Sequence, residues 1–193
     1  MRVKLISVSL IGLFLVSALS PTVLIPPRDL TEPRQVFLID HGTHTSIAIE
    51  TTEETFIRYA YGDKNYYALR NTDLASGVRA LLIPTDAVLA RAELAITPSV
   101  EGVIDALPVV VQKVYPLQVE GFKADQLISS LDEIYTSGQE ELIEVSAYGL
   151  NFVPHPDDYS WMNNSSTMIA SWMRQMEITT IGWGLLAYWR VTG

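Results

Sequence analysis

The feature that most constrains this chain is a run of helix-capping side chains directly before an apolar segment. Residues 163–167 read Asn-Asn-Ser-Ser-Thr, and such side chains satisfy the free amides of a first helical turn. The apolar residues that follow recur at helical spacing and predict one buried face: Met168, Ile169, Trp172 and Met176. A polar side chain at a buried helix N-terminus lies among free N–H donors, where the anion of a nucleophile is stabilised. The alternative is an ordinary serine-rich N-cap.

Length and charge limit the class of protein. The 193 residues, 48% of them hydrophobic, are enough for one domain with a sizeable core. The net charge of -9 and the lack of a basic stripe argue against a nucleic-acid partner. The chain has no cysteine, which excludes disulfides, a thiolate zinc site and a lipid-modified cysteine anchor. We expect no cofactor.

The N-terminus is basic and then uncharged. No charge occurs over Leu5–Ile25, and a helix of about 20 apolar residues can span a bilayer. The preceding Arg2 and Lys4 would stay in the cytoplasm. The sequence therefore predicts a single pass of the inner (cytoplasmic) membrane, with a soluble domain on the periplasmic or extracytoplasmic side. An uncleaved anchor is favoured over a signal peptide, because Pro21 follows the small residues of the cleavage motif.

These observations divide the chain into three parts. We expect a signal anchor or signal peptide over 1–27, a linker over 28–35 and one folded domain over 36–193. Within that domain, residue patterns predict buried strands at Val36–Ile39 and Thr45–Ile49 and helices at 73–82 and Lys123–Tyr135. The apolar run Ile181–Tyr188 is expected to close the core.

Three short blocks carry a resemblance to a known family. The first block is a predicted strand followed by Gly42, His44 and a second predicted strand. The second block is Tyr61-Gly62-Asp63, which lies between aromatic residues. The third block runs from Asn163 to Met168. Together they resemble a bacterial family of unknown function whose hallmark is Asn-x-Cys-Asn-x-Trp. That family is itself similar to circularly permuted NlpC-type papain-like cysteine peptidases.

The resemblance implies both a fold and a set of site residues. The implied fold is α+β, a permuted papain-like domain with a central antiparallel sheet and packed helices, preceded by the N-terminal hydrophobic helix. Ser165 occupies the position of the family cysteine, and His44 that of its general base. Arg58 stands where the family has a glutamate, and arginine cannot accept a hydrogen bond from imidazole. Asp63 is the candidate substitute for that orienting role.

Further side chains near these motifs are candidates for substrate binding. They are Tyr61, Tyr67, His155, Asn163 and Trp161. Packing of the tyrosines in the core is the structural alternative. No resident metal is expected from the resemblance.

Three functions remain in competition. We favour a non-catalytic protein of the cell envelope that binds a cell-wall or lipid ligand, because both the thiol and the orienting acid are replaced. The first alternative is a serine amidase, esterase or acyltransferase acting on peptidoglycan peptides or lipids through Ser165 and His44. The second is a metal-binding protein using His41, His44 and His155. The ligand, the partner proteins and the oligomeric state are left open.

Overall fold

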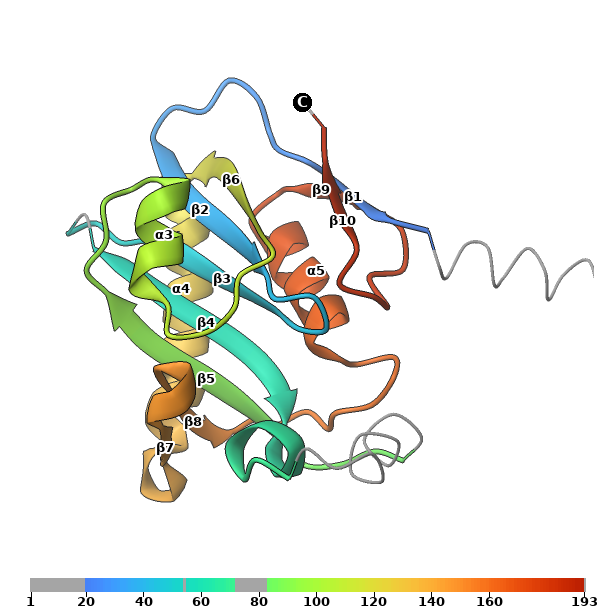
Figure 1. Ribbon diagram of the computed structural model, residues 1–193. Coiled ribbons are helices and arrows are strands. Elements are labelled where there is room, and N and C mark those ends of the chain that lie inside the picture. The colour runs from blue at the N-terminus through green and yellow to red at the C-terminus, as the bar shows by residue number, and fades with distance from the viewer. Residues whose placement is uncertain (1–19, 54, 72–82, 193) are drawn as a thin grey trace, which may run out of the picture.

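The computed structural model describes residues 20–53, 55–71 and 83–192. Its main feature is a seven-stranded antiparallel sheet with the strand order β6-β2-β3-β4-β5-β8-β7 (Figure 1). The bounds of these strands are β2 Pro33–Asp40, β3 Thr45–Glu50, β4 Phe56–Asp63, β5 Ala87–Leu94, β6 Lys113–Glu120, β7 Ile143–Val145 and β8 Leu150–Pro154. The strands expected at Val36–Ile39 and Thr45–Ile49 are confirmed, and they pair as a hairpin.

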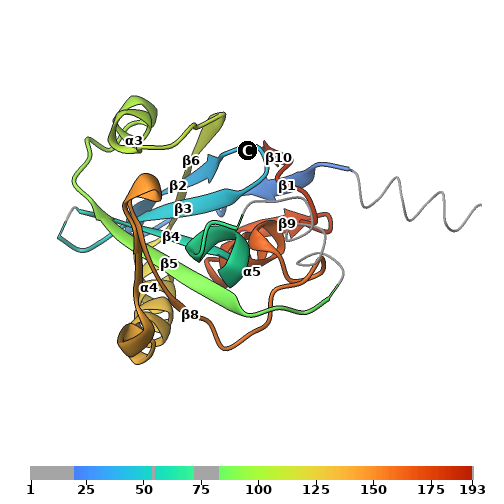
Figure 2. The ribbon, with the colours of Figure 1, turned by 60° about the horizontal axis from the view of Figure 1, so that its bottom comes forward.

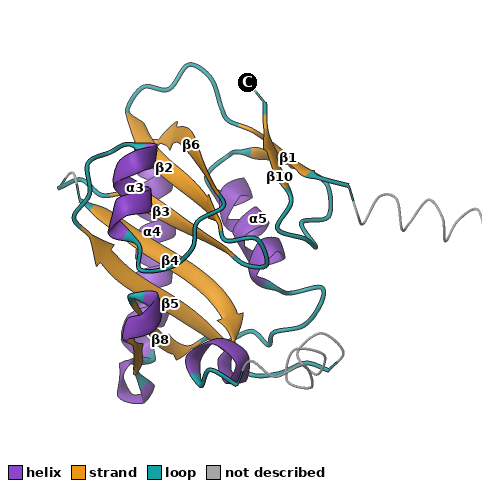
Figure 3. Ribbon diagram, in the orientation of Figure 1, coloured by secondary structure: helices purple, strands orange, loops and turns teal. Residues whose placement is uncertain are grey.

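Helices cover both faces of this sheet. α3 (Val100–Ala106) lies on one face, whereas α4 (Gly121–Ser137) and α5 (Ser165–Gln175) lie on the other (Figure 2). The short helical turns η1 (Lys64–Ala68), η2 (Gln139–Glu141) and η3 (Ser146–Tyr148) follow or precede strands (Figure 3). The expected helix over Lys123–Tyr135 is confirmed within α4. The expected helix at 73–82 lies outside the described residues.

Strand alternation divides β4 between two cores. Ile57 and Tyr59 belong to the cluster that contains the apolar faces of α4 and α5. Phe56 packs in a separate cluster with Val103 of α3. Because successive side chains of a strand point to opposite faces, Arg58 is directed to the α3 face of the sheet.

A second sheet corrects the fold expected from the sequence. β1 (Thr22–Ile25) pairs in parallel with β10 (Trp189–Val191) and antiparallel with β9 (Thr179–Ile181). The expected hydrophobic helix over Leu5–Ile25 is therefore wrong at its C-terminal end. β-branched residues favour strand there, and Pro21 would interrupt a helix. No helix of the described residues is long and apolar enough to cross a membrane; residues 1–19 lie outside that part.

The papain-like assignment of the fold also needs correction. The described residues form a sheet-rich mixed fold with ten strands in two sheets. The helix that begins with Ser165 packs against the face of the sheet opposite to the one that Arg58 faces. A papain-like site would need that helix to face the histidine, so the resemblance in short motifs does not extend to this architecture.

The expectation that Ile181–Tyr188 closes the core is also wrong. Most of Ile181–Tyr188 is exposed rather than closing the core, and Ile181, Trp183, Leu186 and Tyr188 are among the most exposed large apolar side chains. The following Trp189 is buried, and its indole N–H donates to the Thr45 hydroxyl at 3.0 Å.

Candidate functional site

A pocket on the α3 face of the sheet gathers the polar side chains with unused binding capacity. Its volume is about 250 Å³, and we call it the Arg58 pocket. Its lining residues come from the turn before β3, from β4, from η1, from the segment after α3, and from η3 and β8. They are His41, Thr43, His44, Arg58, Tyr66, Tyr67, Val109, Val110, Tyr148, Leu150 and Phe152.

Arg58 is held by neutral groups. Its Nε–H donates to the Ser46 hydroxyl at 3.1 Å, one terminal N–H donates to the Tyr148 carbonyl at 3.1 Å, and another donates to His41 Nε2 at 3.2 Å. Arg58 is only 2% exposed, and burial lowers its pKa to about 10, so it stays charged at neutral pH. A guanidinium has more N–H donors than these three contacts use.

The hydrogen bonds of His41 define its tautomer. Its Nδ1–H donates to the Val110 carbonyl at 2.8 Å, and its Nε2 accepts from the Ser46 hydroxyl at 3.0 Å as well as from Arg58. Burial is the main cause that lowers the pKa of His41 to about 4, and the charge of Arg58 adds to it. His41 is therefore neutral at pH 7.

His44 contributes a ring nitrogen without a partner. Its Nδ1 is buried and makes no hydrogen bond within the described part of the chain. The ring lies 4.4 Å from that of Tyr67, centroid to centroid. Burial, and then the charges of His41 and Arg58, lower the pKa of His44 to about 3. An unpaired buried polar atom costs free energy, so this nitrogen is an unsatisfied polar group at the pocket.

The pocket lacks a negative charge of its own. No carboxylate lines it, and no ion pair joins Arg58 to any residue that the structure describes. Buried charges in folded proteins are normally paired. Arg58 is therefore a buried cation without a counter-ion, at the base of a cavity with aromatic walls.

Tyr67 forms one of those walls because Gly62 leaves room for it. A Cβ added at Gly62 would overlap the Tyr67 ring. Gly62 belongs to β4, and Tyr67 to η1 directly after that strand. Gly62 of the Gly62-Asp63 block therefore helps to shape the pocket.

Ser165 lies elsewhere. It is the first residue of α5, after an Asn164 cap whose side chain accepts from the Ser166 and Thr167 amides. Ser165 is buried, and burial raises the pKa of the Tyr159 hydroxyl to about 12. Ser165 does not line the Arg58 pocket, and no hydrogen bond joins it to His44 among the described residues. The helix start was predicted correctly; the Ser165–His44 pair stays a prediction.

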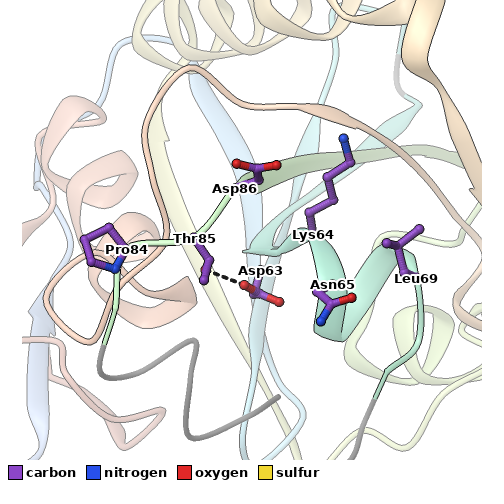
Figure 4. Close-up of a pocket in the computed structure, with 7 residues that line it drawn as sticks. All are labelled: Asp63, Lys64, Asn65, Leu69, Pro84, Thr85 and Asp86. Atoms are coloured by element: carbon purple, nitrogen blue, oxygen red, sulfur yellow. Dashed lines mark hydrogen bonds between the residues drawn. The ribbon is translucent and has the colours of Figure 1, made fainter. Parts of the chain in front are cut away.

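Asp63 has partners other than an imidazole. Its carboxylate accepts from the Tyr66 amide at 2.6 Å and from the Thr85 hydroxyl. Asp63 and Thr85 line a different hollow, in which the two side chains point toward each other (Figure 4).

The remaining sequence candidates form a cluster near Tyr61. The Tyr61 hydroxyl donates to the Asp158 carbonyl at 3.0 Å, and the Asn163 side-chain amide donates to the Tyr61 oxygen at 3.0 Å. The His155 ring packs edge-on against Tyr61, with the centroids 4.9 Å apart. These contacts fix the loop before α5. Trp161 in that loop is 44% exposed.

The histidines do not assemble a metal site. His41 and His44 stack with their ring centroids 6.3 Å apart, whereas His155 does not line their pocket. Within the described ranges, no group of three or more metal-ligating side chains lies close enough together to hold an ion.

Sequence reasoning singled out His44 and Tyr67 but misjudged Arg58. It treated Arg58 only as the loss of an orienting acid. The signal was the position of an arginine inside the strand sequence Phe-Ile-Arg-Tyr-Ala-Tyr, because an unpaired charge at the centre of an apolar strand requires a compensating partner.

Comparisons of the chain with family models, with curated proteins and with solved structures found no match.

Proposed function

We propose that this protein is a non-catalytic binding protein whose Arg58 pocket holds a ligand by a carboxylate group. The observation that carries the proposal is a buried guanidinium with unused N–H donors and no carboxylate partner in the described structure. A carboxylate accepts two parallel N–H bonds from a guanidinium and neutralises its single charge.

The rest of the pocket defines the body of the ligand. The Tyr66, Tyr67, Tyr148 and Phe152 rings supply apolar walls. The volume of about 250 Å³ lies just under the range of typical small-molecule sites. This supports a group the size of an amino acid or a short acyl or aromatic acid, including the carboxylate terminus of a cell-wall peptide or lipid.

The neutral histidines complement this ligand. His44 Nδ1 has no partner and can donate to a carboxylate oxygen when protonated at that nitrogen. A bound anion also opposes the charge of Arg58, so it favours the imidazolium form of both histidines. Binding, rather than hydrolysis, is the proposal because Ser165 contributes no atom to this pocket.

Calorimetric titration with benzoate and with benzamide tests the proposal. The two probes share shape and apolar surface, and only benzoate carries the charge. We expect Arg58→Gln to weaken benzoate binding about 10- to 100-fold, the size of a lost hydrogen bond to a charged group, and to leave benzamide unaffected. Arg91 is a partly buried arginine outside the pocket, so Arg91→Gln is the matched control. This variant should bind benzoate like the unmodified protein. Equal affinity for the two probes would refute the proposal.

A further inference from the structure

The exposed apolar side chains concentrate in two loops. Those of interest follow β8 and join β9 to β10, and we call them the tryptophan surface: Trp161, Met162, Ile181, Trp183, Leu186 and Tyr188. Trp161 is 44% and Trp183 47% exposed, whereas the other two tryptophans, Trp172 and Trp189, are 2% and 3% exposed. Exposed large apolar side chains that gather on one part of a surface mark an interaction site.

One buried side chain fixes the two loops together. The Asn164 amide donates to the Trp161 carbonyl at 2.9 Å and to the Leu185 carbonyl at 3.1 Å. The same Asn164 caps α5. The loops are thus set against one rigid helix end, and both lie on the side of the molecule where the described chain begins (Figure 1).

The tryptophan surface continues into the start of the described chain. Ser20, Pro21 and Val23 line a hollow together with Ile181 and Trp183. Gly184 N–H donates to the Thr22 hydroxyl at 3.0 Å. In the sequence, the stretch from Leu5 to Ser20 that leads up to this hollow carries no charge.

The C-terminal part of the tryptophan surface differs in charge from the loop after β8, which carries the exposed Asp157 and Asp158. The chain has a net charge of -9, yet residues 178–193 contain Arg190 and no acidic residue. Arg174 lines the same hollow as Trp183. Both arginines are exposed, and neither forms an ion pair with another described residue.

We infer that the tryptophan surface rests on a lipid bilayer with anionic head groups. Trp and Tyr side chains favour the membrane interface because they combine apolar rings with polar N–H or O–H groups. Arg174 and Arg190 add attraction to anionic lipid. The adjoining uncharged stretch leads from the same edge of the domain, which makes a bilayer the occupant whose chemistry fits both features.

Tryptophan quenching in the full chain tests this contact separately from attachment by residues 1–19. The protein is mixed with vesicles of phosphatidylcholine and phosphatidylglycerol, with or without brominated phosphatidylcholine. We expect the brominated lipid to quench the emission, and we expect this quenching to be lost in the double variant Trp161→Phe, Trp183→Phe, which retains the two buried tryptophans. Arg174→Gln with Arg190→Gln should reduce the dependence of the quenching on the phosphatidylglycerol fraction.

Any one of the following results would overturn the inference. One is vesicle-bound protein whose emission brominated lipid does not change, because attachment would then leave this surface in water. Another is equal quenching of the double variant and the unmodified protein, or no binding to vesicles at all. The last is a dimer in analytical ultracentrifugation whose tryptophans are already shielded without vesicles, which would assign the surface to a second copy of the chain.

Discussion

Two arginines on neighbouring strands of the same sheet have different kinds of partner. Arg91 of β5 faces α4, where its Nε lies 2.8 Å from the Asp132 carboxylate and a terminal nitrogen lies 3.2 Å from Glu93. Arg58 of β4 faces the opposite side and contacts only a hydroxyl, a carbonyl and an imidazole. Arg58 is nevertheless the more deeply buried of the two.

The two arginines differ in whether a carboxylate of the protein neutralises their charge. Arg91 and the Tyr59 hydroxyl both donate to Asp132 Oδ1, the latter at 2.6 Å, so the α4 side is a satisfied network that joins helix to sheet. The Arg58 side has the same cation without the anion. Under the proposed function, the carboxylate of a ligand supplies the anion that the described residues do not provide to Arg58.

Removing Asp132 should have the largest effect on stability. Asp132→Ala leaves Arg91 and Tyr59 without their shared acceptor, and we expect a loss of about 3 kcal/mol in the free energy of unfolding. Arg58→Met should lower it less, because the variant removes a buried charge that has no counter-ion, and this gain offsets the three hydrogen bonds that are lost. Urea denaturation followed by circular dichroism measures both. If Arg58→Met lowered the free energy of unfolding as much as Asp132→Ala, both arginines would contribute to stability in the same way, which would contradict the prediction.

The second-largest effect on stability should come from acid, through His41 and His44 on the Arg58 face of the sheet. The pKa values of His41 and His44 in the folded protein, about 4 and about 3, lie below the ordinary value of 6.5. As the pH falls below 6.5, the unfolded chain therefore takes up protons first, and stability is lost until the folded-state values are reached. Each histidine contributes a slope of up to about 1.4 kcal/mol per pH unit.

Denaturation between pH 7 and 5 measures that slope, and nuclear magnetic resonance titration of the ring protons assigns it. His44→Asn should reduce it by one histidine's share. Saturating benzoate should raise both pKa values and flatten the profile, because the anion opposes the charge of Arg58. Unchanged histidine pKa values in the presence of bound benzoate would place the anion away from this pocket.

Ser165 should have the smallest effect. Ser165→Ala changes a side chain on the α5 side of the sheet, so we expect benzoate affinity to stay within about twofold, well below a lost hydrogen bond. We also expect ester hydrolysis to stay at the background rate in both proteins. Turnover of a p-nitrophenyl ester by the unmodified chain that Ser165→Ala abolishes would restore the serine-hydrolase alternative.

Local patterns predicted those elements whose signals lie within a few residues. The Asn164 cap with Thr167 formed the expected helix start, and the apolar spacing over Lys123–Tyr135 formed α4. β1 was missed because its partners, β9 and β10, come from the far end of the chain. An uncharged segment alone does not distinguish a membrane helix that continues to Ile25 from one that gives way to a strand.

The candidate site was only partly predictable for the same reason. The family resemblance identified His44 and the Gly62-Asp63 block, which lie within short motifs. Which residues meet across the sheet depends on strand alternation and on which helix covers which face. Arg58 and Ser46 are twelve positions apart and become partners only through the pairing of β3 with β4.

The pairing of β1 also sets an order of events during synthesis. Thr22 is paired with Trp189, so β1 leaves the ribosome long before its partner strands exist. At elongation rates of about 5–20 residues per second, the interval is on the order of ten seconds. The seven-stranded sheet, whose last strand ends at Pro154, can form within that time. The three-stranded sheet can close only after β9 and β10 have been made, so it completes the described fold last.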